Sequence, residues 1–244
     1  EFAEKQLPQN CLVLEAGSGE GYGAYQLSKS AKVKNITGLD VDAETIAHAS
    51  KKYISTNCAF KHYDGSKIPF ADESFDAVIS FQVIEHIEND KNYVAEIFRI
   101  LKNNGILILS TPNRAYRLKP GQKPWNRFHV REYDENSLKE ILQTKFQDVQ
   151  MLGVKGNAEI QQNEINRTKK ILKVISFDPL NLRNLIPEKM KNMIIKALKK
   201  IIFRKSETIK EYFTSKYSTS DFYTIQNNFD DSLDLLVICK KIKS

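Results

Sequence analysis

A short run of glycines beside an acid is the first place where the sequence indicates chemistry. The run includes Glu15, Gly17, Ser18, Gly19 and Gly21, and it lies between an apolar stretch and an expected helix. Glycine allows backbone angles closed to other residues and lets a ligand lie against bare main chain. Free N–H groups at a helix start attract an anionic group. This layout predicts a nucleotide-binding crevice at the end of a parallel strand, with a glycine-rich turn that binds nothing as the alternative.

Two further acids follow expected strands. Asp40 ends the second expected strand, where a carboxylate can accept hydrogen bonds from both hydroxyls of a ribose, and this acid alone also fits a nicotinamide dinucleotide. Asp64 and Gly65 follow the third expected strand, where an acid can accept from an exocyclic amine such as that of adenine. Asp-Gly is also a common turn, so Asp64 has a structural alternative.

The ordered set of these segments resembles the class I S-adenosylmethionine-dependent methyltransferases. The matching segments are Glu15-x-Gly17-x-Gly19-x-Gly21, Asp40, Asp64-Gly65, Phe75 to Ser80, Val83 to Ile87, and Glu96 to Asn113. The family has a proline and two glycines where this chain has Asn103-Asn104-Gly105, and an Asn-Asn-Gly turn can form the same tight corner. The ordered set is far more specific than any one piece.

The resemblance implies S-adenosylmethionine as the cofactor and S-adenosylhomocysteine as the product. It implies that Glu15 orients the methionine end, that Asp40 holds the ribose, and that Asp64 with the Gly65 backbone reads the adenine. The complete set of implied cofactor residues is Glu15, Gly17, Ser18, Gly19, Asp40, Val41, Asp64, Gly65, Phe81 and Gln82.

Two histidines are candidates for a general base. Methyl transfer is an in-line displacement that requires alignment of the nucleophile and exclusion of water, so we expect no metal ligands. His129 lies in a segment, Asn126 to Tyr133, that resembles one in small-molecule and sugar O-methyltransferases related to the ubiquinone-pathway enzymes. Glu85 and His86 are expected to open a helix after the fourth expected strand. A histidine can accept the proton of an attacking hydroxyl near neutral pH, and a structural hydrogen-bonding role is the alternative for each.

The composition suits a globular protein. The chain has 244 residues, 41% of them hydrophobic, and no apolar run approaches the ~20 residues that span a bilayer. Cys11, Cys58 and Cys239 are widely spaced, which favours buried thiols in a reducing cytosol over disulfides or a metal site. No signal peptide is visible, so we expect a cytoplasmic protein that can also lie against the inner face of the membrane.

Alternating strands and helices predict an α/β fold with a doubly wound, parallel sheet. The resemblance implies a Rossmann-like, mostly parallel sheet of seven strands with an antiparallel last strand. We expect Asp42 to cap the second helix, and Asp134 or Asn136 to open the fourth. The expected strands are Cys11–Glu15, Asn35–Asp40, Cys58–His62, Phe75–Ser80, Ile106–Ser110, Phe146–Leu152 and Ser232–Cys239. The expected helices are Ala24–Ala31, Ala43–Tyr53, Asp90–Leu101 and Asn136–Gln143.

Residues 154–231 are predicted to form a long, helical and basic insertion, and residues 1–153 with 232–244 the cofactor-binding catalytic domain. The segment Lys155–Lys216 has 15 Lys and Arg against 6 Asp and Glu, a net charge of +9, so the rest of the chain carries −2. Within it, Pro187–Lys205 has apolar residues at helical spacing among lysines. A lid over the acceptor site, a helix on an anionic membrane surface and a nucleic-acid contact are the alternatives, the last least expected because the apolar stripe would go unused.

The sequence therefore predicts an enzyme that methylates oxygen on a small molecule or glycan. No Asn-Pro-Pro-Tyr motif follows the fourth expected strand, which argues against methylation of amino groups on bases or glutamine. The two other interpretations are a lipid or quinone methyltransferase at a membrane surface and a cofactor-binding subunit without catalytic turnover.

Overall fold

The computed structural model describes residues 1–176 and 217–242, with the side chains of 170–176 left aside. The chain forms two compact units. The first comprises Glu1–Val154 and Thr224–Ser244, and the second comprises Lys155–Tyr223. The expected amphipathic helix Pro187–Lys205 lies outside the described residues.

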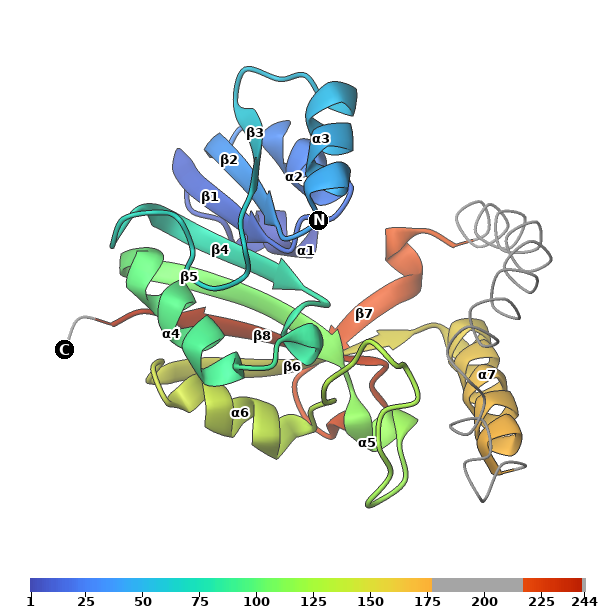
Figure 1. Ribbon diagram of the computed structural model, residues 1–244. Helices are drawn as coiled ribbons and strands as arrows, with labels where there is room; N and C mark the ends of the chain where they lie inside the picture. Colours follow the sequence, from blue (N-terminus) through green and yellow to red (C-terminus); the bar gives the residue numbers. More distant parts are fainter. Residues whose placement is uncertain (177–216, 243–244) are drawn as a thin grey trace, which may run out of the picture. The chain divides into compact units, whose positions relative to one another are not determined.

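The first unit is organised by a sheet whose strands follow the order β3-β2-β1-β4-β5-β8-β6-β7 (Figure 1). The strands are β1 (Cys11–Ala16), β2 (Val33–Asp40), β3 (Cys58–His62), β4 (Phe75–Phe81), β5 (Leu101–Pro112), β6 (Asp148–Gly156), β7 (Phe222–Ile225) and β8 (Asp234–Lys240). The pairs among β1 to β5 are parallel, whereas β8 runs antiparallel between β5 and β6. The direction of winding reverses between β1 and β4, which is where such sheets bind ligands.

The predicted doubly wound sheet with an antiparallel last strand is confirmed, but the prediction of seven strands is wrong. The eighth strand is β7, a four-residue strand at the end of the sheet order, within the segment predicted as an insertion. Its shortness explains the omission, because four residues without a longer alternation carry little strand signal and the pairing depends on tertiary context.

Six short helices accompany the strands in the first unit. They are α1 (Phe2–Gln6), α2 (Tyr22–Ser28), α3 (Ala43–Lys52), α4 (Asp90–Ile100), α5 (Arg114–Arg117) and α6 (Glu135–Gln143). As predicted, Asp42 caps α3 by accepting a hydrogen bond from the Thr45 N–H at 2.9 Å. Of the two candidates for the start of α6, Asp134 is the cap, and it forms a capping box with Ser137.

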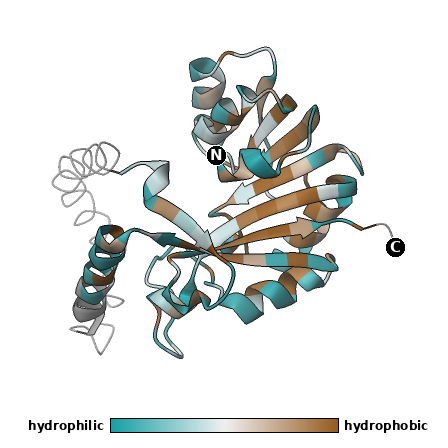
Figure 2. Cartoon of the chain, turned by 180° about the vertical axis from the view of Figure 1, so that it is seen from behind, coloured by the Kyte–Doolittle hydropathy of each residue, from teal (hydrophilic) through white to brown (hydrophobic). Residues whose placement is uncertain are grey.

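The alternation of side chains along the strands divides the core into two layers. Leu14 belongs to the cluster on one face, with Ile97 of α4 and Leu138 of α6, and its neighbour Val13 belongs to the cluster on the other face, with Ala24 of α2. Figure 2 shows the central strands as predominantly hydrophobic and the helices as predominantly hydrophilic. The three cysteines are buried free thiols within this core.

The segment after β4 departs from expectation. A helix was predicted to open at Glu85-His86, but Ile84–His86 form a single 3₁₀ turn, and α4 begins only at Asp90. Asn89 caps α4, since its side chain accepts from the Asn92 N–H at 3.1 Å. The short turn holds Glu85 and His86 at the end of the sheet instead of within a helix.

The second unit contains the helix α7 (Ala158–Ser176) and the 3₁₀ turn Thr219–Asp221. Asn157 ties the two together, because its side-chain amide donates to Asp221 Oδ1 at 2.8 Å. Over the described ranges 1–176 and 217–242, no helix combines the length and the apolar character that crossing a membrane requires.

Candidate active site

The glycine turn after β1 is held in place by main-chain hydrogen bonds. The N–H groups of Gly17 and Ser18 both donate to the Leu39 carbonyl, at 2.7 and 3.0 Å. Gly17, Gly19 and Gly21 have positive φ values of 77°, 50° and 81°. At Gly17 a Cβ would also collide with the Val83 side chain, whereas at Gly19 it would meet nothing within 4 Å. The turn therefore requires glycine for its backbone, and at Gly19 it faces open space.

Asp40, the last residue of β2, is joined to the glycine turn. Its Oδ2 accepts from the Gly19 N–H at 2.7 Å, and its Oδ1 accepts from the Asp42 N–H at 3.0 Å. Val41, beside it, is 55% exposed. Because a carboxylate oxygen has more than one acceptor direction, Asp40 can bind ribose hydroxyls while it fixes the turn.

Glu15 is a buried acid at the same edge of the sheet. It lies in β1 between Gly38 of β2 and Ile79 of β4 and is 8% exposed. Burial raises the pKa of its carboxyl to about 7, against a hydrogen bond from the Ala24 main chain that lowers it. Its Oε2 has no hydrogen-bond partner. A cationic group placed here would supply the missing partner and stabilise the ionised form.

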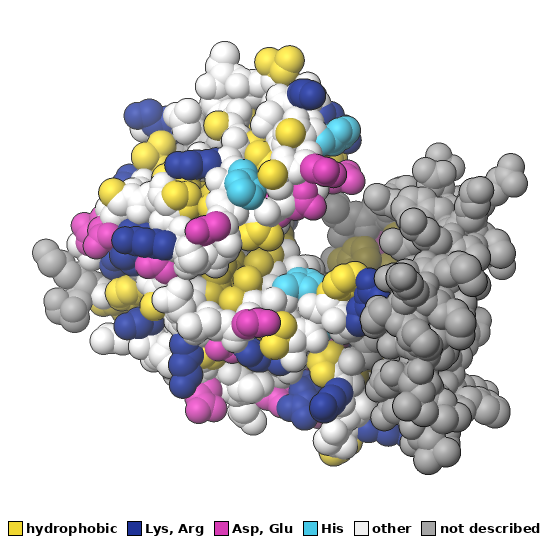
Figure 3. Space-filling model, viewed as in Figure 1, with side chains coloured by type: hydrophobic (Ala, Val, Ile, Leu, Met, Phe, Trp, Pro, Cys, Tyr) yellow, Lys and Arg dark blue, Asp and Glu magenta, His cyan; other side chains and the backbone are white. Residues whose placement is uncertain are grey.

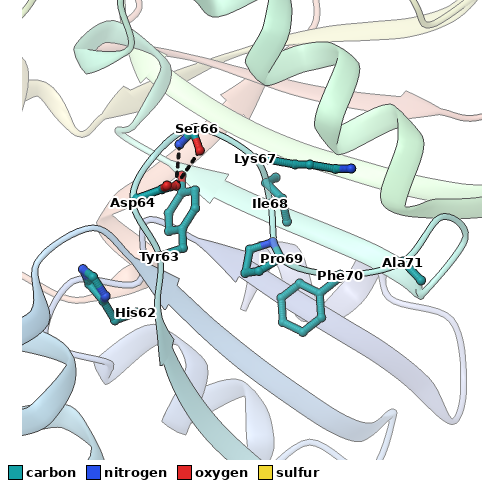
Figure 4. A pocket seen from close by; sticks show the side chains of 9 residues that line it. All are labelled: His62, Tyr63, Asp64, Ser66, Lys67, Ile68, Pro69, Phe70 and Ala71. Carbon is teal, nitrogen blue, oxygen red and sulfur yellow. Dashed lines mark hydrogen bonds between the residues drawn. The ribbon is translucent and has the colours of Figure 1, made fainter.

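Asp64 and Gly65 lie in the loop after β3. Asp64 is exposed, and its Oδ1 accepts from the N–H and the hydroxyl of Ser66 at 3.0 and 2.6 Å (Figure 4). These hydrogen bonds lower the pKa of the Asp64 carboxyl. The loop continues around a pocket that is lined by His62, Tyr63, Asp64, Ser66 to Phe70 and Ala71. Asp64 thus closes a local turn at the mouth of this pocket.

Phe81 and Gln82 lie at the end of β4, where the sequence placed them. Phe81 is 38% exposed. Gln82 adopts a positive φ of 58°, and its N–H donates to the Ser110 carbonyl of β5 at 2.9 Å. The unusual backbone angle turns the chain away from the sheet and directs it into the 3₁₀ turn that carries Glu85.

The two candidate bases lie side by side, although 43 positions separate them in the sequence. The rings of His86 and His129 are 4.9 Å apart between centroids and almost perpendicular, at 85°. His86 Nδ1 lies 2.9 Å from the Phe128 carbonyl, and His129 Nδ1 lies 2.8 Å from Glu132 Oε1. Both acceptors favour a proton on Nδ1, which leaves Nε2 of each neutral ring with a free lone pair.

The main chain explains how the two histidines meet. The N–H groups of Val130 and Arg131 both donate to the Glu85 carbonyl, at 2.8 and 3.4 Å. The Arg131 guanidinium donates to the carbonyls of Ile87 and Glu88 and pairs with Asp90. The segment after β5 is therefore fixed against the turn after β4 by its backbone as well as by its side chains.

Glu85 joins this pair as a fully buried acid. Its Oε2 accepts from the Thr111 hydroxyl at 2.9 Å, and its Oε1 has no hydrogen-bond partner. Burial raises the pKa of the Glu85 carboxyl. Glu85, His86 and His129 each offer a ligand atom within 4.8 Å of the others. Sequence reasoning assigned no role to Glu85, Thr111 or Glu132, although the spacing His-x-x-Glu of His129 and Glu132 is a readable signal.

One of the candidate bases, His86, and the loop after β3 line the same pocket. A pocket of the first unit is lined by Gly65 and Ser66 on one side and by His86, Ile87 and Tyr93 on another. Figure 3 shows hydrophobic side chains on the floor of a recess on this face, with histidines and carboxylates near it. An acceptor in this pocket would lie between the loop that carries Asp64 and the imidazole of His86.

Comparisons with known proteins agree with this geometry. The family described as "Methyltransferase domain" matches residues 14–109. A protein of Mycolicibacterium smegmatis named "Probable S-adenosylmethionine-dependent methyltransferase" is 39% identical over 159 residues, which are 63% of this chain and 60% of that protein. The phthiotriol/phenolphthiotriol dimycocerosates methyltransferase of Mycobacterium tuberculosis is 31% identical over 93 residues, 38% of this chain and 34% of that protein.

Solved structures share the fold at low identity. The crystal structure of the [4+2]-cyclase SpnF superposes with a TM-score of 0.60 at 17% identity, over 99% of this chain and 80% of that one. The strand order, the glycine turn and the strand-end acids define a Rossmann-like fold of the methyltransferase type. Residues 14–109 match the methyltransferase-domain family, and the chain spans about 60% of the length of the first relative named above.

Proposed function

We propose that this chain binds S-adenosylmethionine and transfers its methyl group to a hydroxyl oxygen of a small molecule or glycan. The observation that carries the proposal is the pair formed by His129 and Glu132, whose side chains lie 2.8 Å apart and whose histidine packs against His86 of the pocket lining. A histidine oriented by a buried carboxylate is suited to accept a proton from an attacking hydroxyl.

The crevice fits the proposed cofactor. The unpartnered Oε2 of Glu15 matches the ammonium of the methionine end, and the open space beside Gly19 admits a ligand against bare main chain. Asp40 would accept from the ribose, with Val41 beside it, and Asp64 with the Gly65 backbone would read the adenine. Gly17 and Ser18 complete the turn, and Phe81 and Gln82 border the donor. When bound, the cofactor supplies the sulfonium methyl group as the electrophile.

In the proposed reaction His129 accepts the proton from the acceptor hydroxyl through Nε2, with His86 as the alternate base. Glu132 holds the proton on Nδ1 and stabilises the imidazolium that forms. The apolar floor of the recess limits access of water to the reacting atoms. We assign the catalytic role to residues 1–153 and 232–244, and we propose that 154–231 form a helical basic insertion that serves as a lid or as a surface-binding segment.

A lipid acceptor at a membrane surface is the second candidate function. The M. tuberculosis relative is named for a lipid substrate, and the segment that carries His129 exposes two large apolar side chains, Phe128 at 63% and Val130 at 45%. These side chains would contact an acyl tail or the lipid headgroup region. The chain would then work at the inner face of a membrane instead of free in the cytoplasm.

The test is transfer of a labelled methyl group from S-adenosylmethionine across a panel of sugars, phenols and lipids, with mass spectrometry of the products. Formation of S-adenosylhomocysteine together with an O-methyl product supports the proposal. Cofactor binding by calorimetry without any product from the panel favours a cofactor-binding subunit. Binding of a nicotinamide dinucleotide in place of S-adenosylhomocysteine would contradict the proposed cofactor.

A further inference from the structure

The side chains of Glu85, His86 and His129 form a cluster with the composition of a metal site. Each contributes one ligand atom, and these atoms lie within 4.8 Å of one another. Two imidazoles and one carboxylate are the donor set of the facial triads that hold a divalent transition-metal ion and leave other coordination positions open. The sequence did not suggest this set, because Glu85-His86 and His129 lie on different loops.

The hydrogen bonds around the two imidazoles direct their lone pairs. His86 Nδ1 faces the Phe128 carbonyl at 2.9 Å, and His129 Nδ1 faces Glu132 Oε1 at 2.8 Å. Metal-ligating histidines in proteins characteristically donate their other ring N–H to a carbonyl or a carboxylate. Each histidine here has such a partner, so each neutral ring keeps a lone pair on Nε2 for an ion.

The carboxylate of Glu85 supplies the second, independent observation. Its side chain is fully buried, one oxygen accepts from Thr111 at 2.9 Å, and the other has no hydrogen-bond partner. A buried carboxylate oxygen without a partner is costly, and a bound cation would satisfy it. Glu132 Oε2 is likewise unpartnered, and the Arg117 guanidinium lies 3.7 Å from Oε1 of the same carboxylate.

We propose that Glu85, His86 and His129 bind one divalent transition-metal ion, and that this ion receives the acceptor hydroxyl in the methyl-transfer reaction. Two imidazole ligands favour Zn²⁺ over Mg²⁺, Ca²⁺ or Mn²⁺, which prefer oxygen ligands. The role of the ion in the reaction rests on the proposed function, whereas the binding of the ion does not. It assigns the Nε2 lone pair of His129 to the metal instead of to a proton.

The reaction balances with the ion as a Lewis acid. The metal lowers the pKa of the bound hydroxyl, whose proton leaves to solvent. The resulting alkoxide attacks the sulfonium methyl, so that an O–C bond forms while the S–C bond breaks. The electron pair of that bond remains on sulfur and gives neutral S-adenosylhomocysteine. No oxidant or reductant is needed.

The first measurement is metal binding itself. Untagged protein treated with a chelator is titrated with Zn²⁺ by calorimetry, and the Co²⁺ form is examined by visible absorption. We expect one equivalent of metal per chain. His86→Ala and His129→Ala should each lower the metal affinity at least tenfold. Glu132→Gln should lower it by roughly tenfold to a hundredfold, because His129 loses the partner that orients its ring. His48→Ala removes an exposed histidine of α3 and should leave metal affinity unchanged.

The outcomes separate this inference from the proposed function. Equal metal affinity in the parent, His86→Ala and His129→Ala proteins, or no stoichiometric binding at all, would overturn the metal site. If methyl transfer persists unchanged in the metal-free protein, the ion has no part in the reaction and His129 remains a base. Binding of S-adenosylhomocysteine serves as the control that each variant is folded. We expect His86→Ala to fold, because His86 is exposed and its replacement removes little buried surface.

Discussion

His129 and Glu132 form a buried pair one helical turn apart in sequence but on a non-helical loop, with Nδ1 and Oε1 2.8 Å apart. The exposed fractions of their side chains are 6% and 0%. Burial of the Glu132 carboxylate costs desolvation free energy, which its contacts with His129 and Arg117 offset. The pair therefore fixes one nitrogen of His129 and leaves the other for chemistry.

We expect His129→Ala to lower turnover by about 10²–10⁴-fold, because the acceptor hydroxyl loses its activating group. Glu132→Gln should retain His129 but favour the wrong tautomer, and should lower turnover less than His129→Ala does. Steady-state assays with labelled S-adenosylmethionine measure both effects, with His48→Ala as the matched control. Turnover within a few-fold of the parent in both variants would show that the pair is structural.

The second prediction concerns Asp40, which both closes the glycine turn and faces the expected ribose. Asp40→Ala removes charge-assisted hydrogen bonds worth ~1.5–3 kcal/mol each, so the affinity for S-adenosylhomocysteine should fall by roughly tenfold to a hundredfold or more. Calorimetry measures this loss. Asp72→Asn, at an exposed acid that pairs with Arg99, is the control and should bind as the parent does. Equal affinity of Asp40→Ala and the parent would contradict the ribose assignment.

The third prediction uses two glycines of the same turn. Both have positive φ, so alanine costs about 1–2 kcal/mol at either position. At Gly17 the new methyl also collides with Val83, whereas at Gly19 it enters open space. Gly17→Ala should therefore lower the melting temperature more than Gly19→Ala does, and Val83→Ala should partly restore it. Gly19→Ala should remain folded and lose cofactor affinity.

Thermal melting with and without S-adenosylhomocysteine distinguishes the two effects. A folded Gly19→Ala protein that binds the ligand as tightly as the parent would show that the open space at Gly19 is not the cofactor site.

Local signals predicted much of the fold. Uniformly apolar runs such as Ile106 to Leu109 in β5 indicated strands, and short polar side chains such as Asp42 marked the helix starts. The order of strand-end acids also predicted the crevice, because parallel strands bring their carboxyl ends to one edge. These features depend on neighbours in the sequence, which is why the residues alone indicate them.

The cluster around His129 depends instead on contacts between distant loops. His86 was predicted within a helix and lies in a 3₁₀ turn, which directs its side chain toward the later segment. The register between the two loops is set by the hydrogen bonds of Val130 and Arg131 to the Glu85 carbonyl. No pattern in either segment specifies this register, so the sequence indicated the candidate histidines separately and not their contact with Glu85.

The last prediction concerns Glu15, whose carboxyl pKa is raised by burial to about 7 from its ordinary value of 4.5. The folded protein then binds more protons than the unfolded chain between about pH 4.5 and 7. The contribution of Glu15 to stability is therefore fully present below pH 4.5 and is lost as the pH rises through about 7, by about 3 kcal/mol. Glu15→Gln should remove this pH dependence of the free energy of unfolding. Glu20→Gln, at an exposed acid of the same turn, should keep it.

Cofactor binding should reverse the effect, because the ammonium of the methionine end stabilises the ionised carboxylate. The affinity of the parent for S-adenosylhomocysteine should rise between pH 6 and 8. Binding should also release a proton, so the binding enthalpy should depend on the ionisation enthalpy of the buffer. Glu15→Gln should bind more weakly and without that proton release. Urea unfolding at each pH and calorimetry in two buffers measure the two slopes. If the parent and Glu15→Gln show the same pH dependence in both experiments, Glu15 neither titrates near neutral pH nor contacts the cofactor.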